Sequence, residues 1–129
     1  MKRVVVTGMA GVTALGNSWP EIKPRLQACR NAVVHMAQWQ EYQGLNTRLG
    51  APITDFSLPA HYNRKQTRSM GRVSQLATVA TELALTRAGL LGEPLLRDGR
   101  TGIAYGSSVG SSAQMGAFGQ MISQKSLEP

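Results

Sequence analysis

The sequence has 129 residues, which is about the length of one domain. Its net charge is +7, hydrophobic residues make up 42% of it, and charged residues make up 16%, below the ~25% of an average domain. This composition excludes a disordered tail, and the single cysteine, Cys29, excludes a disulfide scaffold. No stretch approaches the ~18 consecutive apolar residues of a membrane span, so membrane insertion is not expected. The class that remains is a soluble, intracellular, glycine-rich α/β protein, or a piece of one.

The segment Arg3–Thr7 predicts a buried strand, because it is a short β-branched run that ends at a glycine. A glycine-rich connection follows, up to Gly16. Lys2 and Arg3 before an apolar stretch would also suit a secretory leader, but threonines and glycines interrupt that stretch. We therefore expect a strand here and not a leader.

The first helix is expected from Trp19 to Arg30, with Ser18 and Glu21 spaced for a capping box. Between residues 33 and 56 the apolar pattern breaks up and turn residues recur, which predicts short strands and irregular loops. The clearest helix spans Thr67–Ala88, where apolar residues recur at steps of three and four, and Gly89 follows it as a C-cap.

A loop over Leu90–Arg100 is expected to lead into a second buried strand, Thr101–Ser107, and then a helix from Ser108 to about Ser123. Two strands alone would leave both edges of a sheet open over a thin core. The sequence therefore has the pattern of the opening part of a larger α/β unit.

The glycine-rich turn after the first strand does not match a nucleotide-binding motif. Gly8, Gly11 and Gly16 lack the G-x-G-x-x-G spacing of a dinucleotide site. Asn17 stands where a Walker A motif requires lysine. Tight turns beneath a packed sheet explain these glycines, and no cofactor is expected.

The turn Gly106–Gly110 matches the G-x-S-x-G pattern of a nucleophile elbow, which would make Ser108 the nucleophile of a serine hydrolase. That enzyme class places its histidine after the serine, whereas His35 and His61 both precede Ser108. Cys29 is expected inside the first helix, without a neighbouring histidine to activate it. One cysteine and two scattered histidines also do not form a metal site.

Four cations gather in a stretch that lacks acidic residues from position 56 to 81: Arg64, Lys65, Arg68 and Arg72. Cations at the start of a helix oppose the helix dipole, which indicates an acidic partner for this surface. Nucleic acid is disfavoured, because the patch has no interleaved aromatic residues and matches no known binding module.

Four stretches of the chain carry a family resemblance: Arg3–Gly16, Asn63–Met70, the alanine-rich helix that follows, and Thr101–Gly110. In this order they resemble the N-terminal part of a β-ketoacyl-acyl carrier protein synthase, a cytoplasmic condensing enzyme of the thiolase fold. The resemblance covers essentially all of residues 1–129, but only about the first third of a family member. It implies an α/β, thiolase-like fold, of which this chain is the N-terminal, incomplete portion of a layered αβαβα architecture.

The resemblance also implies a reaction. Family members transfer an acyl group to a cysteine, decarboxylate a malonyl-carrier donor, and join the two in a Claisen condensation for fatty-acid or polyene-type chain elongation. Their catalytic cysteine and two histidines lie further along the chain and do not map onto Cys29, His35 or His61. This segment alone is therefore expected to be inactive, and the family works as a homodimer or a ketosynthase heterodimer.

Two groups of site residues follow from the resemblance. Lys65 and Arg68, with Arg64 and Arg72 as weaker candidates, match positions that bind the acyl carrier protein. Val109, next to Ser108, matches the position that lines the acyl pocket near the dimer interface, although an ordinary core role fits it as well. Two other interpretations stay open: a non-catalytic carrier-binding module, and the serine hydrolase that uses Ser108.

Overall fold

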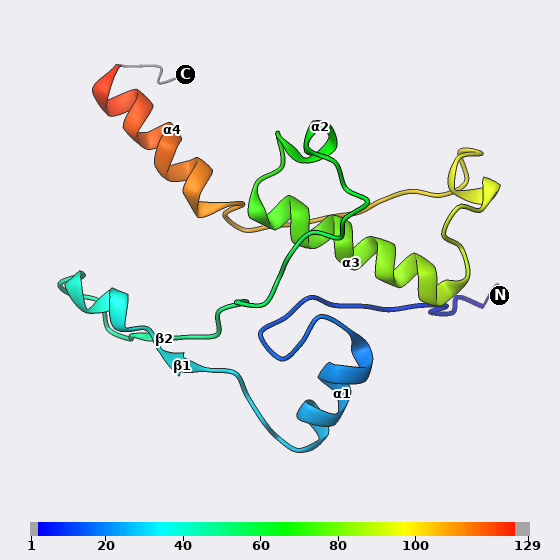
Figure 1. Ribbon diagram of the computed structural model, residues 1–129, viewed down its shortest axis with the longest axis horizontal. Helices are drawn as coiled ribbons and strands as arrows, with labels where there is room; N and C mark the ends of the chain where they lie inside the picture. The colour runs from blue at the N-terminus through cyan, green and yellow to red at the C-terminus, as the bar shows by residue number, and fades with distance from the viewer. Residues whose placement is uncertain (1–2, 126–129) are drawn as a thin grey trace.

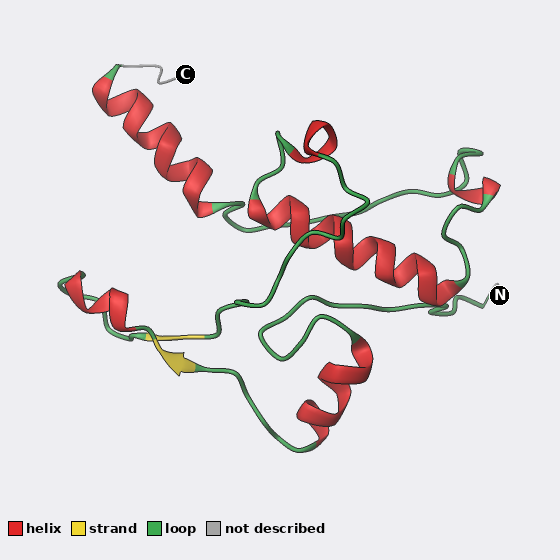
Figure 2. Cartoon of the chain, in the orientation of Figure 1, coloured by secondary structure: helices red, strands yellow, loops and turns green. Residues whose placement is uncertain are grey.

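The computed structural model describes residues 3–125. Its helices and strands are separated by long loops, and α4 and the hairpin β1–β2 project from the body (Figures 1 and 2). In chain order the elements are α1 (Trp19–Gln27), β1 (Val34–His35), the 3₁₀ turn η1 (Ala37–Glu41), β2 (Leu49–Gly50), α2 (Arg64–Thr67), α3 (Arg72–Ala88), the 3₁₀ turn η2 (Pro94–Leu96) and α4 (Ser112–Gln124).

Helix α3 is the longest element and ends where the sequence predicts. Gly89 adopts the left-handed conformation with φ 68°, and its amide donates to the carbonyl of Thr86 over 3.1 Å. The amide of Leu90 donates to the carbonyl of Leu85, so two bonds cap the last turn. Glycine is favoured at this cap because the left-handed conformation costs it no steric penalty.

The predicted single helix from Thr67 is wrong at its start, because the structure divides this region into α2 and α3. Asn63 and Gln66 form a reciprocal capping box that defines α2 as one separate turn. Gly71 is extended (φ −69°, ψ 167°) and begins α3, with the Ser111 hydroxyl packed against it. The sequence predicts these cations at the first turn of the long helix. In the structure Arg64 and Lys65 instead lie on α2, before the long helix begins.

Helix α1 ends earlier than predicted. It stops at Gln27, and Cys29 lies beyond it in the left-handed region with φ 52°, so the expectation that Cys29 is inside a helix is wrong. Glu21 caps the start of α1 in a variant of the predicted box. Its carboxylate accepts from the Ser18 hydroxyl over 2.7 Å and from the Asn17 amide over 3.1 Å. These two hydrogen bonds lower the pKa of Glu21.

The two predicted buried strands are not formed as strands. Residues 3–7 and 101–107 form no strand and are exposed; Val4 and Ile103, for example, are 96% and 79% exposed. Within residues 3–125 neither segment has a hydrogen-bonded neighbour strand, and a ladder needs one. The sheet that is present is the antiparallel hairpin β1–β2, in which Val34 pairs with Gly50 and His35 with Leu49. It lies in the region where the sequence predicts short strands.

The two segments without a partner strand, residues 3–7 and 101–107, both run beside α3 (Figure 1). Gly8 packs so closely that a Cβ atom there would lie 2.5 Å from the carbonyl oxygen of Ala84 and 2.9 Å from the Cβ of Ala88. The Tyr105 hydroxyl donates to the carbonyl of Ala77 over 2.7 Å and lies 2.9 Å from the Thr81 hydroxyl. The small residues of α3 thus allow close contact with one segment and anchor the other.

Burial is slight throughout the described chain. Two hydrophobic residues, Ile22 and Val79, are classed as buried, at 5% and 8% exposure. On α4, Met115, Phe118 and Ile122 lie three and four residues apart and are all more than half exposed. The thin core matches the sequence-based expectation of the opening part of a larger unit. Among the described residues, none of the helices has the length and apolarity to cross a membrane.

Replacing Gly8 with alanine should lower the melting temperature of the protein. The added methyl group would overlap the Ala84 carbonyl and Ala88, and overpacking of this kind costs about 1–3 kcal/mol. Gly119→Ala is the matched control, because a Cβ at Gly119 meets open space and alanine favours helix α4. Differential scanning fluorimetry of both variants tests this. Equal melting temperatures for the two would contradict the close contact at Gly8.

Candidate functional site

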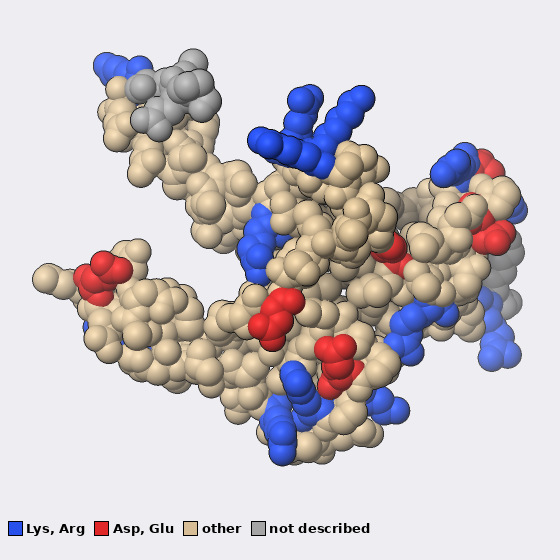
Figure 3. All heavy atoms as spheres, in the orientation of Figure 1, with Lys and Arg blue, Asp and Glu red and all other residues tan. Residues whose placement is uncertain are grey.

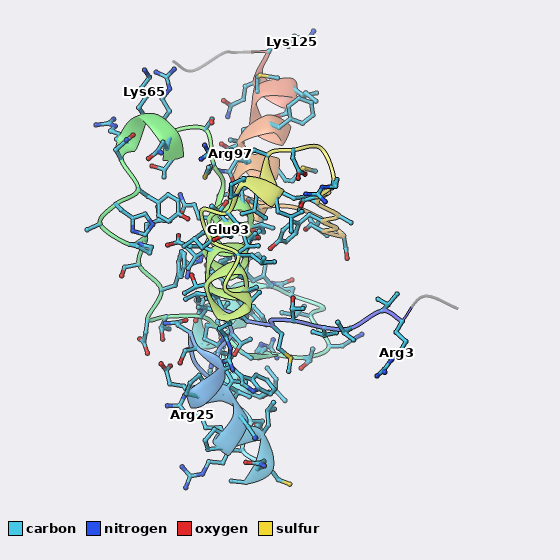
Figure 4. The ribbon with its side chains drawn as sticks, turned by 90° about the vertical axis from the view of Figure 1, so that its right-hand side faces the viewer. Arg3, Arg25, Lys65, Glu93, Arg97 and Lys125 are labelled. Carbon is cyan, nitrogen blue, oxygen red and sulfur yellow. The ribbon has the colours of Figure 1, made fainter. Side chains whose placement is uncertain are left out.

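The sequence-predicted cations of α2 form an exposed basic cluster, defined here as Arg64, Lys65 and Arg68. Lysine and arginine atoms gather over α2 in Figure 3, and Lys65 extends away from the body in Figure 4. In residues 3–125 Arg100 forms an ion pair with Asp98, and Glu82 contacts His61, so no carboxylate there neutralises the cluster. A one-turn helix thus presents three positive charges to the solvent.

Arg72 differs from the other three cations, although it was predicted with them. Its Nη2 donates to the carbonyl of Ile53 over 2.6 Å, and its guanidinium carbon lies 5.4 Å from the centre of the Phe56 ring. These contacts hold the loop before α2 against the start of α3. The structure therefore gives Arg72 an internal role, separate from the basic cluster.

A polar cluster that the sequence did not predict joins the loop before α2 to the middle of α3. The Tyr62 hydroxyl and His61 Nε2 both contact the same oxygen of Glu82, the latter over 3.0 Å. The rings of His61 and Tyr62 lie 4.4 Å apart between centroids. No local motif marks this cluster, because its members are about twenty residues apart in the sequence.

The protonation states of this cluster favour a stable contact. The Tyr62 hydrogen bond, together with the neighbouring His61, lowers the pKa of Glu82, so Glu82 is an ionised acceptor at neutral pH. Burial, and then the bond to Glu82, raise the pKa of Tyr62 to about 12, so its hydroxyl keeps its proton and stays a donor.

The turn Gly106–Gly110 leads into α4 and is attached to the start of α3. Gly110 has φ 75°, and its amide donates to the Ser107 hydroxyl over 2.9 Å. Just beyond the turn, the Ser111 hydroxyl accepts from the Val73 amide over 3.1 Å and so satisfies a free donor in the first turn of α3. The helix begins at Ser112 and not at Ser108 as predicted, which leaves Val109 on the surface and 66% exposed.

A groove of about 600 Å³ lies between α3 and the segment that carries this turn. Its walls are mainly apolar, and Tyr62 and Glu82 contribute to one of them. Ser107 lines the groove, whereas Ser108 and Val109 are not among its lining residues. The two predicted pocket residues therefore lie directly after the groove in sequence, on exposed backbone.

In the part of the chain that the structure describes, no histidine is brought to Ser108 as a base. His61 contacts Glu82, and His35 lies in β1, so neither is hydrogen-bonded to the Ser108 hydroxyl as a serine hydrolase requires. Cys29 lies on a third segment, after α1, and is exposed. Within residues 3–125, no three histidine, cysteine or acidic side chains gather as a metal site would need.

Comparison with known proteins identifies the family. The model of the β-ketoacyl synthase N-terminal domain matches residues 1–127, and the chain belongs to this family. A crystal structure of a β-ketoacyl synthase from Burkholderia phymatum is 55% identical, with a TM-score of 0.87, over 98% of this chain and 31% of that one. The chain thus has the thiolase-like fold of that synthase over the part that it covers.

Similar curated proteins point in the same direction. Nodulation protein E from a Rhizobium species is 36% identical over 110 residues, which are 84% of this chain and 25% of that protein. The 3-oxoacyl-[acyl-carrier-protein] synthase 2 of Synechocystis is 28% identical over 109 residues, which are 84% of this chain and 26% of that protein. The chain therefore spans about a quarter of the length of the curated relatives that it matches.

Proposed function

We propose that this chain is the N-terminal segment of a β-ketoacyl-acyl carrier protein synthase, an acyltransferase that performs a decarboxylative Claisen condensation in fatty-acid or polyene-type chain elongation. The family match over residues 1–127 carries this proposal. The names of the similar proteins, several of them 3-oxoacyl-[acyl-carrier-protein] synthases, support the reaction class. We assign the enzyme to the cytoplasm and propose that it needs no cofactor or metal.

In this proposal residues 1–129 form one segment of a thiolase-like domain with αβαβα layers. The exposed, extended segments 3–7 and 101–107 support it, because apolar side chains such as Val6 and Ile103 project from backbone without ladder partners. Strands from the remainder of the synthase would pair with them and cover the apolar wall of α3. The assembled enzyme would be a homodimer or a ketosynthase heterodimer.

The isolated 129-residue chain should release no carbon dioxide from malonyl-carrier protein and should form no condensation product. Nucleophilic catalysis needs a cysteine or serine with a base in reach, whereas Cys29, His35 and His61 lie on three separate segments. The full-length synthase, assayed in parallel, should be active. Turnover by the isolated chain that Cys29→Ala abolishes would contradict the proposal, and hydrolysis of the thioester to free malonate that Ser108→Ala abolishes would favour the hydrolase alternative.

The acyl carrier protein is the proposed partner of the basic cluster. Arg64, Lys65 and Arg68 are exposed and have no carboxylate partner among the described residues, so they are free to meet an acidic helix. Arg72 is a weaker contact, because Ile53 and Phe56 hold its guanidinium. Many family members carry another basic residue where Ser69 stands, so the positive surface here is smaller. Steering by such exposed charges acts mainly on association and weakens with salt.

Reversing two charges of the cluster should weaken the use of carrier-bound substrates selectively. In the full-length enzyme, Lys65→Glu with Arg68→Glu should raise KM for acyl- or malonyl-carrier protein roughly tenfold at low salt. Small thioester substrates should be used as before. Steady-state assays with both kinds of substrate, at two salt concentrations, measure the difference.

The matched control is Lys23→Glu with Arg30→Glu, because these exposed cations flank the end of α1 and lie outside the basic cluster. That variant has the same change in net charge. Equal loss toward carrier-bound and small substrates in Lys65→Glu/Arg68→Glu, or the same rise in KM in the control, would contradict docking at α2.

Val109 is the proposed acyl-pocket residue, with Ser108 beside it. It is 66% exposed, in a turn attached to α3 through Ser111, and it directly follows the groove residue Ser107 and Ser108 in sequence. The glycines at both ends of the turn leave room beside it, with no atom within 4 Å of a Cβ built at Gly106 or Gly110. Valine is one methylene smaller than the isoleucine common in the family, so the pocket would be slightly wider.

Val109→Phe in the full-length dimer should reduce transfer of long acyl chains far more than transfer of short ones. Pockets discriminate by roughly 1–3 kcal/mol per methylene of fit, so an added ring should shift the chain-length preference by tenfold or more. Acyl transfer from a series of chain lengths, together with the melting temperature, tests this. A flat chain-length profile with a lower melting temperature would mean that Val109 is a packing residue.

A further inference from the structure

We propose that Glu82 is a positioning residue, which holds the basic cluster of α2 in the orientation that binds the acyl carrier protein. This inference rests on the proposed function, because it concerns how the same docking surface is built. Glu82 lies on α3 and accepts contacts from His61 and Tyr62, the two residues directly before Asn63. Asn63 in turn is the N-cap of α2. One carboxylate therefore connects the long helix to the beginning of the short one.

Helix α2 has little else to hold it. It is a single turn without a buried residue, and a helix of this length is not stable on its own. Its C-terminal side is attached to α3 by the chain itself and by Gln75, whose side-chain amide donates to the Met70 carbonyl over 3.2 Å. On its N-terminal side the Glu82 contacts hold the two residues next to its cap, and the Arg72 contacts hold the loop further back, at Ile53 and Phe56. Arg64, Lys65 and Arg68 would keep their charges without the Glu82 contacts, but not their shared orientation.

The Glu82 side chain is suited to this task. It is 24% exposed; its contact with Tyr62 is partly buried, whereas its contact with His61 is exposed. Both contacts use one carboxylate oxygen. Glutamine keeps an acceptor oxygen at the same reach and removes the charge, while alanine removes both. This pair of variants separates hydrogen bonding from electrostatics.

Loss of the Glu82 charge and loss of its positioning contacts should change KM for carrier-bound substrates in opposite directions. Loss of a negative charge near the basic cluster would by itself strengthen the attraction to an acidic carrier protein and lower KM. If Glu82 positions α2, Glu82→Ala should instead raise KM for carrier-bound substrates about tenfold or more, the value of one lost hydrogen bond to a charged group. Glu82→Gln should restore KM to within about twofold of the wild type. Values of kcat with small thioesters should be unchanged in both variants.

Hydrogen exchange provides a second measurement that does not depend on carrier docking. The amides of Gln66, Thr67 and Arg68 are hydrogen-bonded within α2. In full-length Glu82→Ala these amides should exchange faster, while those of the middle of α3 keep their protection. Tyr62→Phe should reproduce the effect. The matched control is Glu41→Ala, since Glu41 is an exposed glutamate at the end of η1, outside the contacts of α2.

The outcomes test the positioning role of Glu82 and, separately, the docking of the carrier protein at α2. Faster exchange in α2 with a raised KM, both reversed in Glu82→Gln, supports the positioning role. Unchanged exchange, or a KM that falls in both Glu82 variants, overturns it. Faster exchange with an unchanged KM would show that Glu82 holds α2 but that the carrier protein does not dock there. That result would overturn the inference by way of the docking proposal, and would leave the condensing activity to be judged by its own assay.

Discussion

The packing of other segments on helix α3 is the constraint on which the rest of this structure depends. Gly8 contacts its C-terminal half, Tyr105 bonds to its middle, and Ser111 caps its first turn. His61 and Tyr62 attach a fourth segment through Glu82. The alanines of α3 make this possible, because small side chains allow neighbouring backbone to approach closely. Substitutions along α3 should therefore affect parts of the chain that are distant in sequence.

Most of the contacts on α3 described above are hydrogen bonds, and few hydrophobic side chains of the described chain are buried. Ile22 and Val79 are buried, while Val4, Ile103 and Val109 remain exposed in the described chain. Hydrophobic burial is the dominant favourable term in folding, so a chain with so little of it depends on further packing partners. The family supplies a consistent explanation, since the chain spans 31% of the crystallised synthase that it matches.

The proposed docking surface follows from the same arrangement. The charges of Lys65 and Arg68 are local properties of α2, but their direction depends on where that single turn is held. Arg72, eight residues after Arg64, is also exposed, but its guanidinium contacts Ile53 and Phe56. Because an acidic helix recognises several charges at once, the orientation of the cluster matters as much as its charge.

The sequence by itself determined the local features: the three longer helices, the left-handed Gly89 cap, the irregular hairpin region and the family. These depend on residues close together in the chain, where periodicity and turn chemistry are informative. Of the candidate site, the exposed cations of α2 were predictable, because clustered charge is visible in the sequence.

Only the tertiary structure decided the break before α3, the internal role of Arg72 and the Glu82 contacts. Gly71 packs against Ser111, forty residues away, and Tyr62 bonds to Glu82 across twenty, and no local pattern encodes such pairs. The strands predicted at residues 3–7 and 101–107 failed for a related reason. A run of β-branched residues favours extended backbone. A β-strand forms only where the backbone of a neighbouring strand accepts and donates the ladder hydrogen bonds.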